Sequence, residues 1–134
     1  MEQLKEALSA AGIAYKENEP LCAHCTFRIG GPADLFVLPE NEEQLCAAIR
    51  LAKEAGVKSY LLGNGSNILF EDAGYRGAVI NVSAMKSGIG VIENISFPGK
   101  DPALTYDAVV VGAGQMLSSL CMAALENSLS LIHI

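Results

Sequence analysis

The sequence has little of what several classes of protein require. It contains no tryptophan, only 6% aromatic residues, and nine lysines and arginines against fifteen aspartates and glutamates. Non-specific nucleic-acid binding needs a basic surface, so a net charge of −6 argues against a nucleic-acid partner. No segment approaches the roughly 20 apolar residues of a transmembrane helix, and the charged start, Met1–Glu6, does not resemble a signal peptide. We therefore expect a cytoplasmic protein with no membrane partner.

The four cysteines do not have the spacing of a metal site. A structural zinc site takes four ligands, usually from two close pairs, and only Cys22 and Cys25 form such a pair. Cys46 and Cys121 fall on apolar faces of predicted helices, where cysteine packs as a small apolar residue. The segment after Cys25 contains Gly30-Gly31-Pro32 and does not start a helix, as a redox Cys-x-x-Cys motif would. We predict no metal and no catalytic cysteine; a metal or redox role is the alternative.

The apolar pattern predicts helices and strands within one domain, since 134 residues suit a single core. Helices are expected over 2–11, 42–55 and 115–126, the second capped by Asn41 with Gln44 at the capping-box position. Strands are expected over 33–38, 57–62, 68–70, 78–82, 91–95 and 106–111, with a turn at 98–102 and irregular structure over 13–33. This order of elements predicts an α+β fold, with helices packed against a mixed sheet.

The buried faces of two helices follow from the same periodicity. The residues expected to be buried are Leu45, Ala48, Ile49 and Ala52 in the second helix, and Leu117, Leu120, Cys121, Ala124 and Leu125 in the third. Asn127 is expected to end the third helix in the left-handed region.

The most informative segment is the glycine loop, Gly63-Asn64-Gly65-Ser66-Asn67, between two apolar runs. Its two glycines can take positive φ angles and let the backbone come close to a ligand. Successive N–H groups of such a loop bind anions such as a diphosphate. The loop lacks the Lys-Ser/Thr ending of a Walker motif, and strand-like Ile68–Phe70 follows it instead of a helix. It therefore predicts a nucleotide cofactor; a tight turn between two strands is the alternative.

Four motifs in this order and spacing resemble the UDP-N-acetylenolpyruvoylglucosamine reductase (MurB) family. They are Thr-Phe-Arg-Ile-Gly-Gly-Pro-Ala-Asp at 26–34, Leu-Gly-Asn-Gly-Ser-Asn at 62–67, Tyr-Arg-Gly at 75–77 and Val-Gly-Ala-Gly at 111–114. The resemblance covers about residues 20–128. It implies a FAD-binding domain of the vanillyl-alcohol-oxidase (PCMH) type, incomplete within 1–134. Residues 1–20 would be an N-terminal helix and lead-in, and 129–134 a tail foreign to the family.

The resemblance also implies the residues of a FAD site. Those expected at the cofactor are Gly63, Asn64, Gly65, Ser66 and Asn67 on the diphosphate, Gly112, Ala113 and Gly114 near the flavin, and Arg28, Gly30 and Gly31 in a turn close by. Arg28 as a solvated loop residue is the alternative. Oxidases of the wider fold link flavin covalently through a histidine in the glycine loop. This loop has none, so non-covalent FAD is expected.

The family reduces the enolpyruvyl group of UDP-N-acetylglucosamine enolpyruvate, with NADPH and FAD, for peptidoglycan synthesis and hence cell-wall biogenesis, cell shape and cell division. Its catalytic Arg, Ser and Glu have no counterpart in this chain. No catalytic residue is therefore assigned, and the chain alone is expected to be an inactive fragment of the oxidoreductase. Two alternatives stay open: a non-enzymatic FAD- or nucleotide-binding module, and a fragment of another PCMH-type flavin oxidase.

Overall fold

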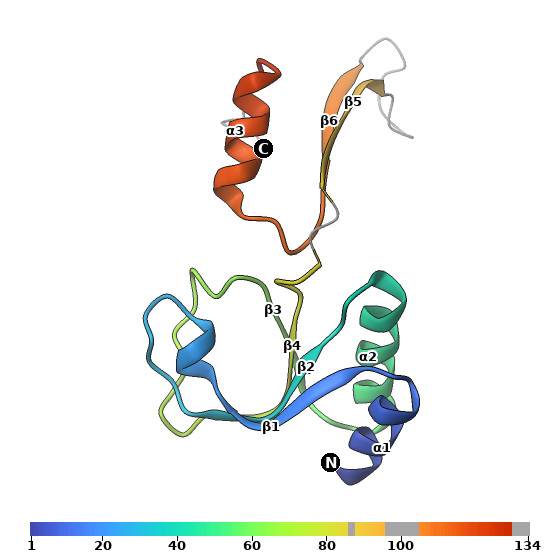
Figure 1. The fold of residues 1–134 in the computed structure, drawn as a ribbon, viewed down its shortest axis with the longest axis vertical. Helices are drawn as coiled ribbons and strands as arrows, with labels where there is room; N and C mark the ends of the chain where they lie inside the picture. Colours follow the sequence, from blue (N-terminus) through green and yellow to red (C-terminus); the bar gives the residue numbers. More distant parts are fainter. Residues whose placement is uncertain (86–87, 96–104, 130–134) are drawn as a thin grey trace. The chain divides into compact units, whose positions relative to one another are not determined.

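The computed structural model describes residues 1–85, 88–95 and 105–129, and the chain divides into two compact units, 1–85 and 86–134. The first unit contains α1 (Glu2–Ala10), β1 (Ala14–Pro20), the 3-10 helix η1 (Leu21–His24), β2 (Pro32–Leu38), α2 (Glu42–Glu54), β3 (Ser59–Leu62) and β4 (Tyr75–Asn81). The second contains β5 (Ile89–Ile95), β6 (Tyr106–Val111) and α3 (Leu117–Glu126) (Figure 1). No helix among the described residues is long and apolar enough to cross a bilayer.

The first unit is built on a four-stranded sheet in the order β1-β2-β4-β3. Strand β1 runs antiparallel to β2, whereas β2 and β3 both run parallel to β4. The predicted α+β fold with a mixed sheet is confirmed. The parallel pairing also excludes the alternative of a tight turn, because parallel strands require a crossover and residues 63–74 must return along the sheet.

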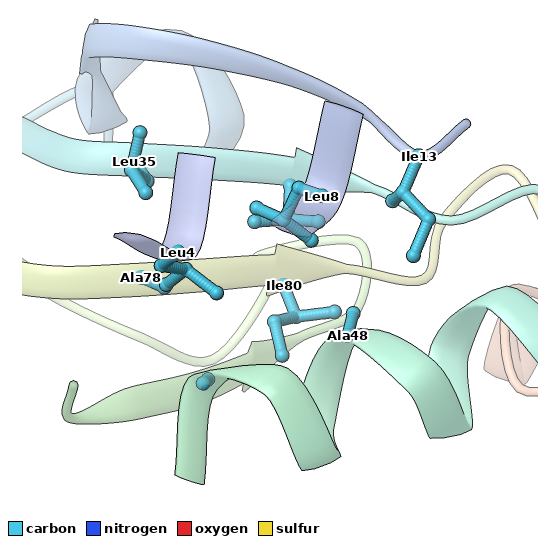
Figure 2. Packing of buried hydrophobic residues seen from close by; sticks show 9 residues of the cluster. Leu4, Leu8, Ile13, Leu35, Ala48, Ala78 and Ile80 are labelled. Carbon is cyan, nitrogen blue, oxygen red and sulfur yellow. The ribbon is translucent and has the colours of Figure 1, made fainter. Parts of the chain in front are cut away.

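Both faces of this sheet carry a hydrophobic core. One cluster joins the helices to the sheet, with Leu4 and Leu8 of α1 and Ala48 of α2 packed around Leu35 and Ile80 (Figure 2). The opposite face carries a second cluster, formed by Leu21, Cys25, Ala33, Phe36, Leu62, Phe70 and Val79. Neighbouring residues of β2 and β4 alternate between the clusters, as the pleat of a strand requires. The second cluster packs the glycine loop and η1 onto the sheet.

Helix α2 begins where the sequence predicts. The Asn41 side chain accepts a hydrogen bond from the Gln44 amide at 2.9 Å, and Gln44 Oε1 accepts one from the Glu40 amide at 2.9 Å. In a capping box the second bond would come from the amide of the N-cap residue Asn41; here it comes from the amide of Glu40, the residue before it. The predicted burial of Ile49 and Cys46 is wrong, since both are exposed. Ala48 faces the sheet, and Cys46 lies roughly 200° around the helix from it.

Two strand predictions in the first unit are also wrong. Residues 14–20, expected to be irregular, form β1. This edge strand is mostly exposed and rich in charge, so it lacks the apolar alternation by which strands are recognised. Residues 68–70, expected to be a strand, form none. Phe70 is nevertheless buried, which shows that this apolar run anchors the crossover to the core.

The second unit consists of a hairpin and one helix. Strands β5 and β6 pair antiparallel, which confirms the predicted strands at 91–95 and 106–111; the turn at 98–102 lies outside the described residues. On the predicted buried face of α3, Ala124 is buried and Leu120 half-buried, but the prediction is wrong for Leu117 and Leu125, which are 72% and 70% exposed, and for Cys121, which is exposed. A two-stranded hairpin offers too little apolar surface to cover such a face. Ser128, not Asn127, takes the left-handed conformation.

Candidate functional site

The glycine loop starts at the carboxyl end of a pair of parallel strands. Leu62, the last residue of β3, pairs with Asn81, the last residue of β4, and the loop begins at the next residue, Gly63. Ligands of sheets with parallel strands bind outside these carboxyl ends, where loops converge and backbone groups are free of the ladder. The topology therefore places the loop where a ligand site is expected.

The two glycines of the loop differ in what they require. Gly65 has a φ of +64°, and a Cβ there would lie 2.0 Å from the carbonyl oxygen of His24. Only glycine fits that position, because the left-handed conformation and the close approach both exclude a side chain. Gly63 does not take a positive φ, and an added Cβ there would meet nothing within 4 Å. The backbone at Gly63 is therefore open to a ligand.

Two distant segments hold the loop in place. From the turn after η1, the Thr26 amide and hydroxyl donate to the Gly65 carbonyl at 2.9 and 3.3 Å. From the end of β4, Asn81 Nδ2 donates to the Gly63 carbonyl at 3.1 Å. Both glycine carbonyls are thus occupied by protein donors, which fixes the loop from two sides.

The loop, η1, the turn after it and the end of β4 line an open, polar cavity of about 400 Å³. It is lined by Ala23, His24, Cys25, Thr26, Arg28, Gly63, Asn64, Asn81 and Ser83. A smaller hollow of about 200 Å³ runs along the loop itself, lined by residues 60–68 with Ser66 and Asn67 among them. Of the predicted residues, the structure therefore brings Arg28, Gly63 and Asn64 together at one cavity.

Arg28 supplies the positive charge of this cavity. Its backbone is left-handed, with a φ of +56°, and its amide donates to the Cys25 carbonyl at 3.2 Å, which closes a short turn. No ion pair of Arg28 with a carboxylate is found in the described part of the chain, unlike Arg76, which pairs with Asp34 at 2.8 Å. An exposed guanidinium with no carboxylate partner favours an anionic ligand.

Gly30 and Gly31 pack closely against the crossover segment 70–74. A Cβ at Gly30 would lie 2.5 Å from Cβ of Phe70, and one at Gly31 would lie 2.0 Å from the Asp72 carbonyl oxygen. The Gly31 amide also donates to the Glu71 carbonyl at 2.9 Å. These glycines join their turn to the crossover, and neither lines the cavity. Their requirement for glycine follows from backbone packing without any ligand.

The second glycine segment belongs to the second unit. It follows β6, where the Gly112 amide donates to the Gly88 carbonyl at 3.2 Å and the Gln115 amide to the Gly112 carbonyl at 3.0 Å. Ala113 is exposed and Gly114 is buried. The segment is a tight turn between β6 and α3.

Six residues that line the cavity were not predicted as site residues: Ala23, His24, Cys25, Thr26, Asn81 and Ser83. His24 stacks on Phe36 with ring centroids 4.1 Å apart, and its Nε2 lies 2.8 Å from Glu19 Oε1. Hydrogen bonds from Lys16 and His24 lower the pKa of Glu19 below its usual value. Asn81 could have been singled out from the sequence, because it is a polar residue within the apolar run 78–82.

The cysteines contribute no metal site in the part of the chain that the structure describes, where no group of three or more potential ligands occurs. Cys25 is buried in the second cluster, and its thiol donates to the Ile29 carbonyl at 3.4 Å. Cys22 is half-buried.

Comparisons with known proteins place the chain in a family. The FAD binding domain family matches residues 33–133. UDP-N-acetylenolpyruvoylglucosamine reductase from Clostridium perfringens strain 13 is 36% identical over 134 residues, covering 96% of this chain and 40% of the relative. The enzyme of that name from Halalkalibacterium halodurans is 46% identical over 115 residues, covering 85% and 34%. The chain therefore spans about two fifths or less of these relatives.

A solved structure shares the fold. The BBE-like 1 variant from Physcomitrella patens superposes with a TM-score of 0.50 at 22% sequence identity, over 69% of this chain and 23% of that one. At this identity the likeness concerns the fold alone, and it agrees with the predicted PCMH-type architecture. Because the family match spans most of the sequence, the chain belongs to the FAD-binding domain family.

Proposed function

We propose that the cavity beside the glycine loop binds the diphosphate of FAD, and that the chain is part of a UDP-N-acetylenolpyruvoylglucosamine reductase. The observation that carries the first part is the open backbone at Gly63, beside Arg28 in a polar cavity of about 400 Å³. The names of the relatives, 36–46% identical, support the second part.

The residues present fit a diphosphate. Arg28 offers a guanidinium for its negative charge, and Asn64 lines the same cavity. Ser66 and Asn67 extend this polar surface along the smaller hollow. Gly112, Ala113 and Gly114 are proposed at the flavin on the resemblance alone, whereas Gly30 and Gly31 support the site through their packing against the crossover.

When bound, FAD would supply the redox chemistry by which NADPH reduces the enolpyruvyl group of UDP-N-acetylglucosamine enolpyruvate. The residues of this chain would bind and orient the cofactor; none is assigned a proton-transfer role, so the chain alone should not turn over NADPH with that substrate. The parent enzyme would act in the cytoplasm, in peptidoglycan precursor synthesis. Because the glycine loop has no histidine, FAD should be released on denaturation.

A titration with FAD tests the cofactor proposal. The wild-type chain should change the visible spectrum and fluorescence of added FAD, and denaturation followed by filtration should return all of it to the filtrate. Gly63→Val should keep the folded circular dichroism spectrum, because a Cβ at this position meets no protein atom within 4 Å, yet weaken FAD binding at least tenfold by filling the ligand's space. A wild-type chain that folds but takes up no FAD would refute the proposal.

A further inference from the structure

The buried side chain of Asn81 makes a hydrogen bond to the first peptide of the glycine loop. This residue ends β4 beside Leu62 and is only 4% exposed. Its Nδ2 donates to the Gly63 carbonyl at 3.1 Å. A polar side chain at such a position must be hydrogen-bonded, because burial of an unpaired amide is costly.

Ser83 fixes the direction of this amide. The Ser83 backbone N–H donates to Asn81 Oδ1 at 3.1 Å, and the Ser83 hydroxyl makes a short contact with the same oxygen. The backbone N–H can only donate and the Gly63 carbonyl can only accept, so together they assign the oxygen of the amide to Ser83 and its NH₂ group to Gly63. These hydrogen bonds can therefore form in only one of the two orientations of the Asn81 side-chain amide.

The hydrogen bond to Gly63 fixes the orientation of a whole peptide group. Because a peptide is planar, fixing the Gly63 carbonyl also fixes the plane of the Gly63–Asn64 peptide, and with it the direction of the Asn64 N–H. Gly63 adopts no left-handed conformation, and its Cβ position faces open space. A left-handed turn or contacts around the Cβ position of Gly63 are therefore not what selects the orientation of this peptide.

We infer that Asn81 is the positioning residue of the glycine loop: through Gly63 it sets the first loop peptide in the orientation that receives a ligand. The effect on FAD rests on the proposed function, but the effect on the loop does not. Without this bond, the loop would occupy its binding-competent conformation for a smaller fraction of the time. Apparent affinity falls by the same fraction.

Two variants at this position and one matched control test the inference. Asn81→Ala removes the donor, and Asn81→Asp keeps the shape but replaces the donor by an acceptor. Asn41→Ala is the control, because loss of a helix cap destabilises the same unit at a residue that does not line the cavity. All three are made in the full chain and compared with wild type by thermal melting.

Hydrogen exchange measures the loop without any ligand. The peptide that covers residues 63–67 should exchange about tenfold faster in Asn81→Ala than in Asn41→Ala, after correction for global stability. FAD affinity should fall by about tenfold in Asn81→Ala and by roughly a hundredfold in Asn81→Asp at pH 8, where a carboxylate also repels the diphosphate.

A pH profile separates positioning from general damage to the fold. A protonated aspartic acid can donate to the Gly63 carbonyl, so Asn81→Asp should recover FAD affinity as the pH falls from 8 to 5, relative to Asn81→Ala. The other ionisable groups of the cavity, His24 with its partner Glu19, Cys25 and Arg28, are the same in both variants. Their contribution therefore cancels in the comparison.

The outcomes distinguish this inference from the proposed function. If hydrogen exchange of residues 63–67 in both Asn81 variants is the same as in Asn41→Ala, the inference is overturned, whether or not FAD binding changes. Faster loop exchange in a series where even the wild-type chain takes up no FAD would uphold the positioning of the loop and reject the cofactor. Faster exchange together with pH-dependent recovery of Asn81→Asp supports both.

Discussion

The two compact units of the chain distribute their apolar residues in opposite ways. In the first, apolar side chains of β2 and β4 alternate between two buried clusters. In the second, large apolar residues such as Leu117, Met122 and Leu125 are more than half exposed. Burial on both faces of a sheet specifies a register and a rigid site, because a shift by one residue would exchange the two faces. The second unit has little of that constraint.

The largest expected effect is on the core of the first unit. Phe36 has no exposed surface and stacks on His24, so Phe36→Ala should lower the free energy of unfolding by about 3–5 kcal/mol. Leu125→Ala on α3 should change it by less than about 0.5 kcal/mol, as a surface substitution does. Urea denaturation followed by circular dichroism measures both. Equal losses from the two variants would abolish the contrast between the units.

A smaller effect is expected at the glycine loop. Gly65→Ala forces a side chain into a left-handed conformation and against the His24 carbonyl oxygen; it should destabilise the first unit by about 1–3 kcal/mol. Gly63→Ala, which introduces the same group where nothing lies within 4 Å, should stay within about 0.5 kcal/mol of wild type. Thermal melting of the pair compares them directly. If Gly63→Ala proved the more damaging, the assignment of Gly65 as the structural glycine would be wrong.

The smallest expected effect is electrostatic. The hydrogen bonds from Lys16 and His24 lower the pKa of Glu19, so the charged carboxylate stabilises the folded state above the usual value of 4.5. That contribution is lost as the pH falls below this value toward the pKa of the folded state. Glu19→Gln should therefore melt slightly below wild type at pH 7 and merge with it near pH 3. A difference that grew at acid pH would contradict the ion pairs.

The sequence predicted the elements whose signals are local. The α2 helix has its cap at Asn41 and its end at Gly56, and β2 is an apolar run stopped by Pro39, so both were expected within one or two residues. Strand β1 was missed, because an exposed edge strand has no apolar alternation and its pairing with β2 depends on residues far away in sequence. The pattern on α3 predicted a buried face, but periodicity cannot tell whether a partner surface exists.

The same limit applies to the site. The glycine loop was found from its composition, and Arg28 through a family motif, and the structure brings Arg28, Gly63 and Asn64 to one cavity. Asn81 and Ser83 were missed because their importance lies in hydrogen bonds across parallel strands. His24 is held by Glu19 and Phe36, and nothing in the sequence indicates that these three side chains meet.

The bonds that hold the glycine loop also have a kinetic consequence. Thr26 reaches Gly65 across 39 positions of the chain, and Asn81 reaches Gly63 across 18. Contacts between residues so far apart in sequence form slowly, because the intervening chain must lose conformational entropy before the contact can contribute its free energy. The loop is therefore expected to acquire its final shape late in folding, after the sheet has paired. A partly folded chain with native secondary structure would still lack the cavity, so cofactor uptake would report the last step of folding.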